Sequence, residues 1–220
     1  MNQFGIERYV KPSYDEIREL AFTLYEKIRQ SGWIEDVDVA LGRGGLFALR
    51  SLQDYYVAAG IKIPYTVISV ERYTGIGSGA GGAVKMKGLS PSAIKGKKVL
   101  LVDDVSDTGA TLAAVKEACA KKGAAEVRSA TIHFKPWSRL KPDYYAQRVD
   151  AWIIYPWNLY ETLRELVTSM RGAGLGGKEI AQELSRANVL PSEVARLKDL
   201  VGRQGEGLGD LLEMVLKEMG

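Results

Sequence analysis

Short apolar runs alternate with amphipathic stretches along the first 170 residues of the chain. Runs rich in β-branched and aromatic residues predict strands, and apolar residues three or four positions apart predict helices. Strands are expected at 37–45, 63–73, 98–105, 126–134 and 150–157, and helices at 13–30, 46–60, 111–123 and 159–170. Because the strands are apolar throughout and helices separate them, we expect an α/β fold with a mainly parallel five-stranded sheet flanked by helices.

Two segments between the strands follow neither pattern. Residues 74–96 contain so many glycines that we expect a long mobile loop, and loops of this length in compact domains are usually functional. Residues 135–147 are expected to form a second loop with a little helix. Ligands of parallel sheets bind at the carboxyl ends of the strands, so Gly42–Gly45, Asp103–Thr111 and Lys135 are the candidate site segments.

The pattern changes after Met170. A glycine-rich stretch at 171–177 predicts a flexible joint, and short helical patterns follow it near 177–187, 192–203 and 208–219. We therefore expect two domains, one covering residues 1–163 and a helical extension covering residues 164–220.

Composition narrows the class of protein. A hydrophobic content of 46% is ordinary for a globular chain, and a net charge of +3 is too small to indicate nucleic-acid binding. The single cysteine, Cys119, excludes an internal disulfide and a multi-cysteine metal site, and it fits a reducing compartment. No window resembles a signal peptide or reaches the ~18 apolar residues of a membrane span. We expect a soluble cytoplasmic protein without a membrane partner.

Three aspartates, Asp103, Asp104 and Asp107, lie where the strand at 98–105 ends and a helix follows. The backbone N–H groups of residues 107–111 open that helix and point outward, and its dipole favours an anion. Thr108 and Thr111 add hydroxyl donors, and Gly109 allows close approach of the backbone. These features predict a phosphate cradle.

The acidic pair Asp103 and Asp104 precedes this cradle and suits ribose hydroxyls and Mg²⁺. Pleating sends the two side chains to opposite faces, so only one can point at a given diol. Cradle and acids together predict a ribose 5-phosphate pocket in which Asp107 faces the group joined to ribose C1. The alternatives are an ordinary capped helix and a receiver domain, whose acid pair would stand near the start of the chain.

The segment VLLVDDVSDTGATL (99–112) resembles the phosphoribosyl-pyrophosphate (PRPP) signature of type I phosphoribosyltransferases. The resemblance implies the type I phosphoribosyltransferase fold. It also implies that Asp103 and Asp104 hold the ribose hydroxyls and Mg²⁺, and that Asp107 is the general base. The 5-phosphate would be bound by Asp107, Thr108, Gly109, Ala110 and Thr111.

Two further segments are similar to the same family. LGRGG (41–45) is similar to its pyrophosphate loop, which implies that Gly42, Arg43 and Gly44 bind pyrophosphate and that Arg43 assists catalysis. Residues 71–88 occupy the place of its flexible catalytic loop, where the cations that could neutralise pyrophosphate are Arg72, Lys85 and Lys87. A plain glycine turn and a solvated loop remain the alternatives for these two segments.

TIHFKPWS (131–138) and DAWIIYPW (150–157) resemble the purine-binding hood of 6-oxopurine phosphoribosyltransferases. The resemblance implies that Lys135 reaches the purine 6-position, that Trp152 stacks on the ring, and that the backbone of Ile153 and Ile154 reads its edge. Trp152 could instead be a core residue. Lys135 is a pure donor and suits a 6-oxo acceptor.

The helical extension at 164–220 indicates adenine and not a 6-oxopurine as the base. An extension of this length resembles crenarchaeal adenine phosphoribosyltransferases, which end in a three-helix bundle. We therefore expect adenine and PRPP to give AMP and pyrophosphate, with a 6-oxopurine as the alternative base. The family resemblance also implies a homodimer. A third reading is a PRPP-sensing regulator with a DNA-binding tail, but residues 163–220 contain eight Lys/Arg and nine Asp/Glu, so no nucleic-acid partner is expected.

Overall fold

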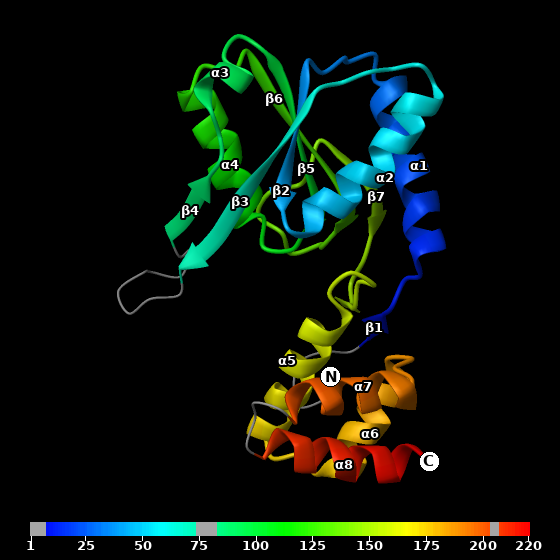
Figure 1. Cartoon of the computed structure of the whole chain (residues 1–220). Coiled ribbons are helices and arrows are strands. Elements are labelled where there is room, and N and C mark those ends of the chain that lie inside the picture. Colours follow the sequence, from blue (N-terminus) through cyan, green and yellow to red (C-terminus); the bar gives the residue numbers. More distant parts are fainter. Residues whose placement is uncertain (1–7, 74–82, 203–206) are drawn as a thin grey trace. The chain divides into compact units, whose positions relative to one another are not determined.

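The computed structural model describes residues 8–73, 83–202 and 207–220 (Figure 1). The chain forms two compact units. One contains residues 15–150, and the other combines the N-terminal residues up to Tyr14 with residues 151–220. The division at residue 163 remains a prediction.

A six-stranded sheet forms the centre of the first unit. Its order is β4-β3-β2-β5-β6-β7, and every neighbouring pair is parallel except β3 with β4. The strands are β2 (Val37–Gly42), β3 (Tyr65–Tyr73), β4 (Ala83–Lys87), β5 (Lys98–Ser106), β6 (Glu126–Phe134) and β7 (Tyr144–Arg148). The predicted α/β class is confirmed, with five parallel strands and an added antiparallel one at the edge.

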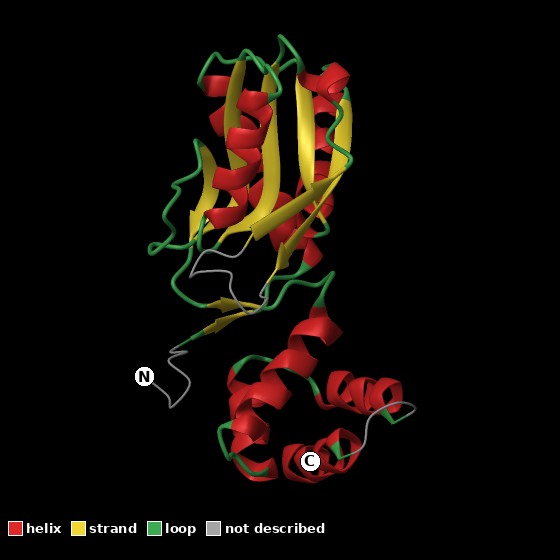
Figure 2. Ribbon diagram, turned by 90° about the vertical axis from the view of Figure 1, so that its left-hand side faces the viewer, coloured by secondary structure: helices red, strands yellow, loops and turns green. Residues whose placement is uncertain are grey.

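Helices cover both faces of this sheet, as Figures 1 and 2 show. On one side lie α1 (Tyr14–Gln30) and α2 (Gly44–Ala58), and on the other lie α3 (Pro91–Ile94) and α4 (Ala110–Lys121). Val39 and Leu101 are opposite each other in the β2–β5 register, and both pack in the core under α4 with Val115. Successive residues of β2 therefore face opposite helix layers, as pleating requires.

The chain reverses its direction of growth across the sheet between β2 and β5. From β2 it proceeds through β3 to β4 at one edge, then returns to place β5 on the other side of β2. The connections that follow β2 and β5 leave the sheet toward opposite faces, because α2 and α4 cover opposite sides. A crevice outside the carboxyl ends of two such strands is where open α/β sheets bind ligands.

Three segments differ from the prediction. The segment 74–96 is predicted to be a loop, but β4 and α3 lie inside it, because its dense run of glycines ends at Gly82 and AVKMK pairs with β3. The expected loop 135–147 contains the start of β7, which pairs with β6. The expected strand 150–157 is reduced to β8 (Trp152–Ile153), which pairs with β1 (Tyr9–Val10) outside the main sheet.

The second unit is helical apart from the β1–β8 pair. Its helices are α5 (Leu159–Gly172), α6 (Gly177–Arg186), α7 (Pro191–Val201) and α8 (Leu208–Met219). The last three follow the predicted patterns, and all four contribute buried apolar residues to one core. Within this unit Lys11 donates to the Glu193 carboxylate at 2.6 Å and to the Asn188 carbonyl at 3.0 Å. None of the helices in the described ranges has both the length and the apolar character to cross a bilayer.

Candidate active site

The two adjacent aspartates lie near the end of β5, beside the turn that follows β2. The Oδ1 atom of Asp103 accepts the backbone amide of Asp104 at 3.0 Å. A Cβ built on Gly44 would lie 1.9 Å from Oδ2 of Asp104, and one on Gly45 would lie 3.3 Å from Oδ1 of Asp103. Successive side chains leave a strand on opposite faces, but Asp103 bends back toward the Asp104 amide. Both carboxylates therefore border the same glycine turn.

That turn holds the residues expected to bind pyrophosphate. Gly42 ends β2, Arg43 is the N-cap of α2, and Gly44 is the first residue of the helix. The peptide bond between Gly42 and Arg43 is cis. A methyl group at position 44 would overlap the Asp104 carboxylate, so any other residue there would displace that carboxylate. The fold thus brings the Gly42–Gly44 turn, which is predicted to bind pyrophosphate, and the acid pair together at the N-terminus of α2, where backbone amides favour an anion.

The predicted phosphate cradle lies in the turn between β5 and α4. Gly109 is the N-cap of α4 with φ +75°, a conformation that favours glycine. A Cβ at this position would lie 2.5 Å from the amide nitrogen of Leu140, so the turn is in close contact with the segment after β6. The Arg139 amide donates to the Thr108 carbonyl at 3.1 Å, and the Ser106 hydroxyl donates to the Leu140 carbonyl at 2.9 Å. Neighbouring chain therefore holds the cradle in place.

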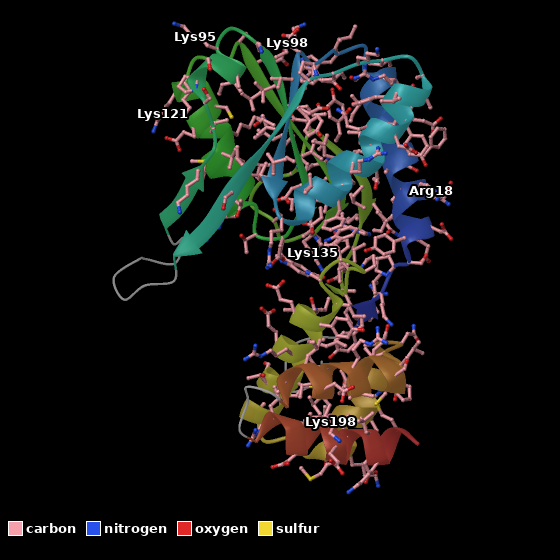
Figure 3. The ribbon with its side chains drawn as sticks, viewed as in Figure 1. Arg18, Lys95, Lys98, Lys121, Lys135 and Lys198 are labelled. Carbon is pink, nitrogen blue, oxygen red and sulfur yellow. The ribbon has the colours of Figure 1, made fainter. Side chains whose placement is uncertain are left out.

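Lys135 follows β6 and lies near Asp107. Figure 3 shows it at the opposite end of the sheet from Lys98, the first residue of β5. Lys135 is only 6% exposed, and its backbone amide donates to the Ser106 carbonyl at 3.0 Å. Burial lowers the pKa of its ammonium group, and the charges of Asp107 and Asp150 oppose that effect. Among the described residues no hydrogen bond to its Nζ atom is found, so its donors suit an acceptor on a ligand.

Trp137 is not among the site residues that the sequence predicts. Its indole Nε1 donates to Oδ1 of Asp107 at 3.1 Å, and the Lys135 ammonium lies 5.3 Å from its ring centroid. It therefore contacts both the predicted general base and the predicted purine donor. Its position two residues after Lys135, in a polar loop that follows a buried strand, was the available signal in the sequence.

The residues of the acid pair fit a magnesium ion. Within residues 8–73, 83–202 and 207–220, no group of three or more His, Cys, Asp or Glu side chains is placed to hold a metal alone. Mg²⁺ is usually held by one or two carboxylates together with substrate phosphates and water. Asp103 and Asp104 supply such carboxylates beside the anion-binding turn.

The predicted catalytic loop at 71–88 is described only in part. Arg72 pairs with Val84 and Lys85 pairs with Glu71 in the backbone ladder of β3 and β4. Lys87, near the end of β4, is exposed. Residues 74–82 lie outside the described residues. The structure therefore places these predicted cations on a hairpin of the sheet edge.

The remaining predicted purine residues belong to the other unit. Trp152 is 40% exposed, so it is not a core residue, whereas Ile154 is fully buried in the core of the helical unit. The amides of Trp152 and Ile154 donate to the Arg8 and Val10 carbonyls. Because strand amides alternate in direction, only Ile153 has an amide on the opposite edge of β8.

Comparison with known proteins assigns the family. The family model described as "Phosphoribosyl transferase domain" matches residues 7–162, which is more than two thirds of the chain. The chain therefore belongs to the phosphoribosyl transferase domain family, and its fold is that of type I phosphoribosyltransferases. The hypoxanthine-guanine phosphoribosyltransferase of Lactococcus lactis is 39% identical over 80 residues, which are 35% of this chain. The chain spans 43% of the length of that relative.

Solved structures share the same fold. The purine phosphoribosyltransferase of Pyrococcus horikoshii has a TM-score of 0.57 and 35% identity, and the match covers 68% of this chain and 93% of that one. A hypothetical protein of Neisseria gonorrhoeae with bound ppGpp has a TM-score of 0.58 and 27% identity, covering 71% and 94%. The xanthine-guanine-hypoxanthine phosphoribosyltransferase of Helicobacter pylori, at 20% identity and a TM-score of 0.59, covers 72% and 99% and supports the fold alone.

Proposed function

We propose that this protein transfers the 5-phosphoribosyl group of PRPP to a purine base, forming a purine nucleoside monophosphate and releasing pyrophosphate. One observation carries the proposal. The Asp104 carboxylate lies against Gly44, so the acid pair and the turn after β2 lie together at the carboxyl ends of the neighbouring strands β2 and β5. The membership in the phosphoribosyl transferase domain family supports the same reaction.

Each of these segments has a role in this proposal. The amides and hydroxyls of residues 107–111 hold the 5-phosphate at the start of α4. Asp103 and Asp104 accept hydrogen bonds from the ribose hydroxyls, and the Gly42–Gly44 turn with Arg43 binds the pyrophosphate. A magnesium ion held by Asp103 and Asp104 would supply positive charge against the pyrophosphate oxygens. Arg72, Lys85 and Lys87 would add charge from the β3–β4 hairpin.

The chemical step is a substitution at ribose C1. The bond from C1 to the pyrophosphate oxygen breaks, and pyrophosphate leaves with the electron pair. The purine N9 lone pair forms the new bond to C1, and the proton on the imidazole edge passes to Asp107. Arg43 and the turn amides stabilise the charge on the leaving group. The carboxylates near C1 stabilise the positive charge that develops on the sugar.

We propose a 6-oxopurine as the base. The Lys135 ammonium is nearly buried and can only donate, which suits a 6-oxo acceptor and opposes the 6-amino group of adenine. The name of the Lactococcus lactis relative supports hypoxanthine and guanine, and the ppGpp-bound neighbour contains a guanine nucleotide. Adenine remains the second candidate because the helical extension resembles that of crenarchaeal adenine enzymes. Stacking of Trp152 on the base and reading of its edge by the Ile153 backbone stay predictions, whereas the Ile154 amide already donates to the Val10 carbonyl.

The decisive experiment offers hypoxanthine, guanine, xanthine and adenine separately with PRPP and Mg²⁺ and measures pyrophosphate release. We expect turnover with at least one 6-oxopurine to exceed that with adenine. In Lys135→Met, kcat/KM for that base should fall by roughly 10- to 100-fold, the worth of one charge-assisted hydrogen bond. Asp107→Ala should keep the fold and lose about 10²–10³-fold in turnover with every base. Adenine as the best substrate would reject the 6-oxopurine assignment.

The same assay tests the regulator reading. A PRPP sensor would bind PRPP without turnover and would shift DNA in a gel, whereas the proposed enzyme releases pyrophosphate and leaves DNA unshifted. The residues of the tail carry a net charge of −1, which favours the enzyme.

We further propose that the protein is a homodimer. Exposed apolar side chains occur on α2 and on the neighbouring β3, namely Leu46, Val57, Tyr65 and Val67. Arg50 and Asp54, also exposed on α2, form an ion pair with each other at 3.5 Å, and a two-fold contact could exchange these partners between two copies. Light scattering of the full chain should give the mass of two copies, and a monomer mass would reject this proposal.

A further inference from the structure

Trp137 stands between the two side chains that the proposed reaction assigns to the purine. Its indole N–H donates to Oδ1 of Asp107 at 3.1 Å, and the Lys135 ammonium lies over its ring at 5.3 Å from the centroid. The ring is 54% exposed, so burial of apolar surface does not account for its presence here. These contacts point to a role in the site.

The contact with Asp107 assigns different roles to the two carboxylate oxygens. An indole nitrogen can only donate, so Trp137 cannot compete for the proton that Asp107 accepts. Its hydrogen bond engages one oxygen and restricts rotation of the carboxylate. The other oxygen is then presented to the substrate in a fixed direction, and proton transfer requires such alignment.

The contact with Lys135 acts on base recognition. The face of the indole ring is electron-rich and attracts the ammonium group, which restricts the long lysine side chain. The backbone supports this arrangement, because the Lys135 amide donates to the Ser106 carbonyl and the Ser138 amide donates to the Lys135 carbonyl. Trp137, on a turn held by backbone hydrogen bonds, therefore restrains both Asp107 and Lys135.

We propose that Trp137 is a positioning residue that aligns Asp107 for proton transfer through its indole N–H and orients Lys135 toward the purine through its ring. This inference rests on the proposed function, because it requires Asp107 and Lys135 to act on a purine. It separates two contributions of one side chain, which substitutions can remove one at a time.

The chain offers a matched control. Trp33 Nε1 donates to the Glu126 carboxylate at 2.8 Å, and Arg128 lies 4.8 Å from the centroid of the Trp33 ring. This is the same combination of an indole, a carboxylate and a cation. Glu126 is the first residue of β6, so the control lies at the opposite end of that strand from Lys135.

The test compares Trp137→Phe, Trp137→Leu and Trp33→Phe by steady-state kinetics with the best purine base. Trp137→Phe keeps a ring beside Lys135 and loses the donor, so kcat should fall about tenfold with KM for the base nearly unchanged. Trp137→Leu loses both contacts, so KM for the base should also rise severalfold. Trp33→Phe should leave both kinetic constants unchanged, even though its unfolding midpoint falls.

The outcomes discriminate sharply. A wild-type kcat in Trp137→Phe would overturn the inference, and so would an equal loss of kcat in Trp33→Phe. A rise in KM alone in Trp137→Phe would make the indole a stacking surface for the base and would also reject the positioning role. Failure of the proposed function is a separate result, because the wild-type protein itself would then release no pyrophosphate with any purine.

Discussion

Asp38 provides a quantitative test of the structure because its carboxyl group is fully buried near the start of β2. Its Oδ2 atom accepts Nε2 of Gln53 at 2.7 Å. Burial raises its pKa from 3.8 to about 8, and the charge of the neighbouring Glu35 adds to the rise. The hydrogen bond from Gln53 and the charge of Arg29 act in the opposite direction. Asp38 is therefore protonated in the folded protein at pH 7.

The direction of the pH effect follows from this proton. The pKa of the folded state lies above that of the unfolded state, so between about pH 4 and 8 the folded protein holds a proton that the unfolded chain releases. Stability from this group is therefore present at low pH and is lost as pH rises through that window. At 1.36 kcal/mol per pKa unit, the loss amounts to roughly 6 kcal/mol, a large part of a typical unfolding free energy.

Asp38→Asn removes the titration while keeping the shape of the side chain and an acceptor for Gln53. Urea unfolding at several values between pH 4.5 and 8.5 would measure the free energy of unfolding of both proteins. The variant should gain stability relative to wild type as pH rises, by several kcal/mol across the window. Asp54→Asn is the control, because the Asp54 side chain is 65% exposed and should change little. Parallel pH profiles for wild type and Asp38→Asn would refute the reasoning.

Two further predictions concern the candidate site and the strand beside it. Gly109→Ala should destabilise the protein and impair PRPP binding, because the new Cβ would lie 2.5 Å from the Leu140 amide; Gly96→Ala, also at positive φ but with open space, should cost only about 1 kcal/mol. Calorimetric titration with PRPP compares the two variants, and equal affinities of Gly109→Ala and Gly96→Ala for PRPP would contradict this prediction. The only histidine, His133, is buried, which lowers its pKa to about 4. NMR of its ring should show a neutral imidazole down to about pH 5, with stability lost as pH falls from about 6.5 toward 4; a normal titration midpoint would contradict the burial.

The segment from β5 to α4 was predictable because its signals are local. A buried strand, adjacent acids and Thr-Gly before a helical pattern specify a strand, a turn and a helix without reference to the rest of the chain. The contact between Asp104 and Gly44 was not predictable in that way, because it depends on β2 and β5 being neighbours. The family resemblance supplied that link, and the sheet order explains it.

Other features depend on pairing that no local pattern reveals. The glycines before residues 83–87 predict a loop, and only the antiparallel pairing with β3 makes this segment a strand. The role of Trp137 was not predictable from its neighbours in the sequence, because its hydrogen bond joins it to Asp107 in a different loop. Trp152 and Ile154 were assigned to one purine hood, but the first is partly exposed and the second lies in the helical core.

The parallel pairing of β1 with β8 has a consequence for how the protein is made. Residues 9 and 10 emerge early from the ribosome, but their partners at 152 and 153 are synthesised after the whole central sheet. The unit at 15–150 can therefore fold during translation, whereas β1 can pair only after residues 152 and 153 have been made. A nascent chain whose residue 150 has just left the ribosome could form the whole central sheet while residues 9 and 10 are still unpaired.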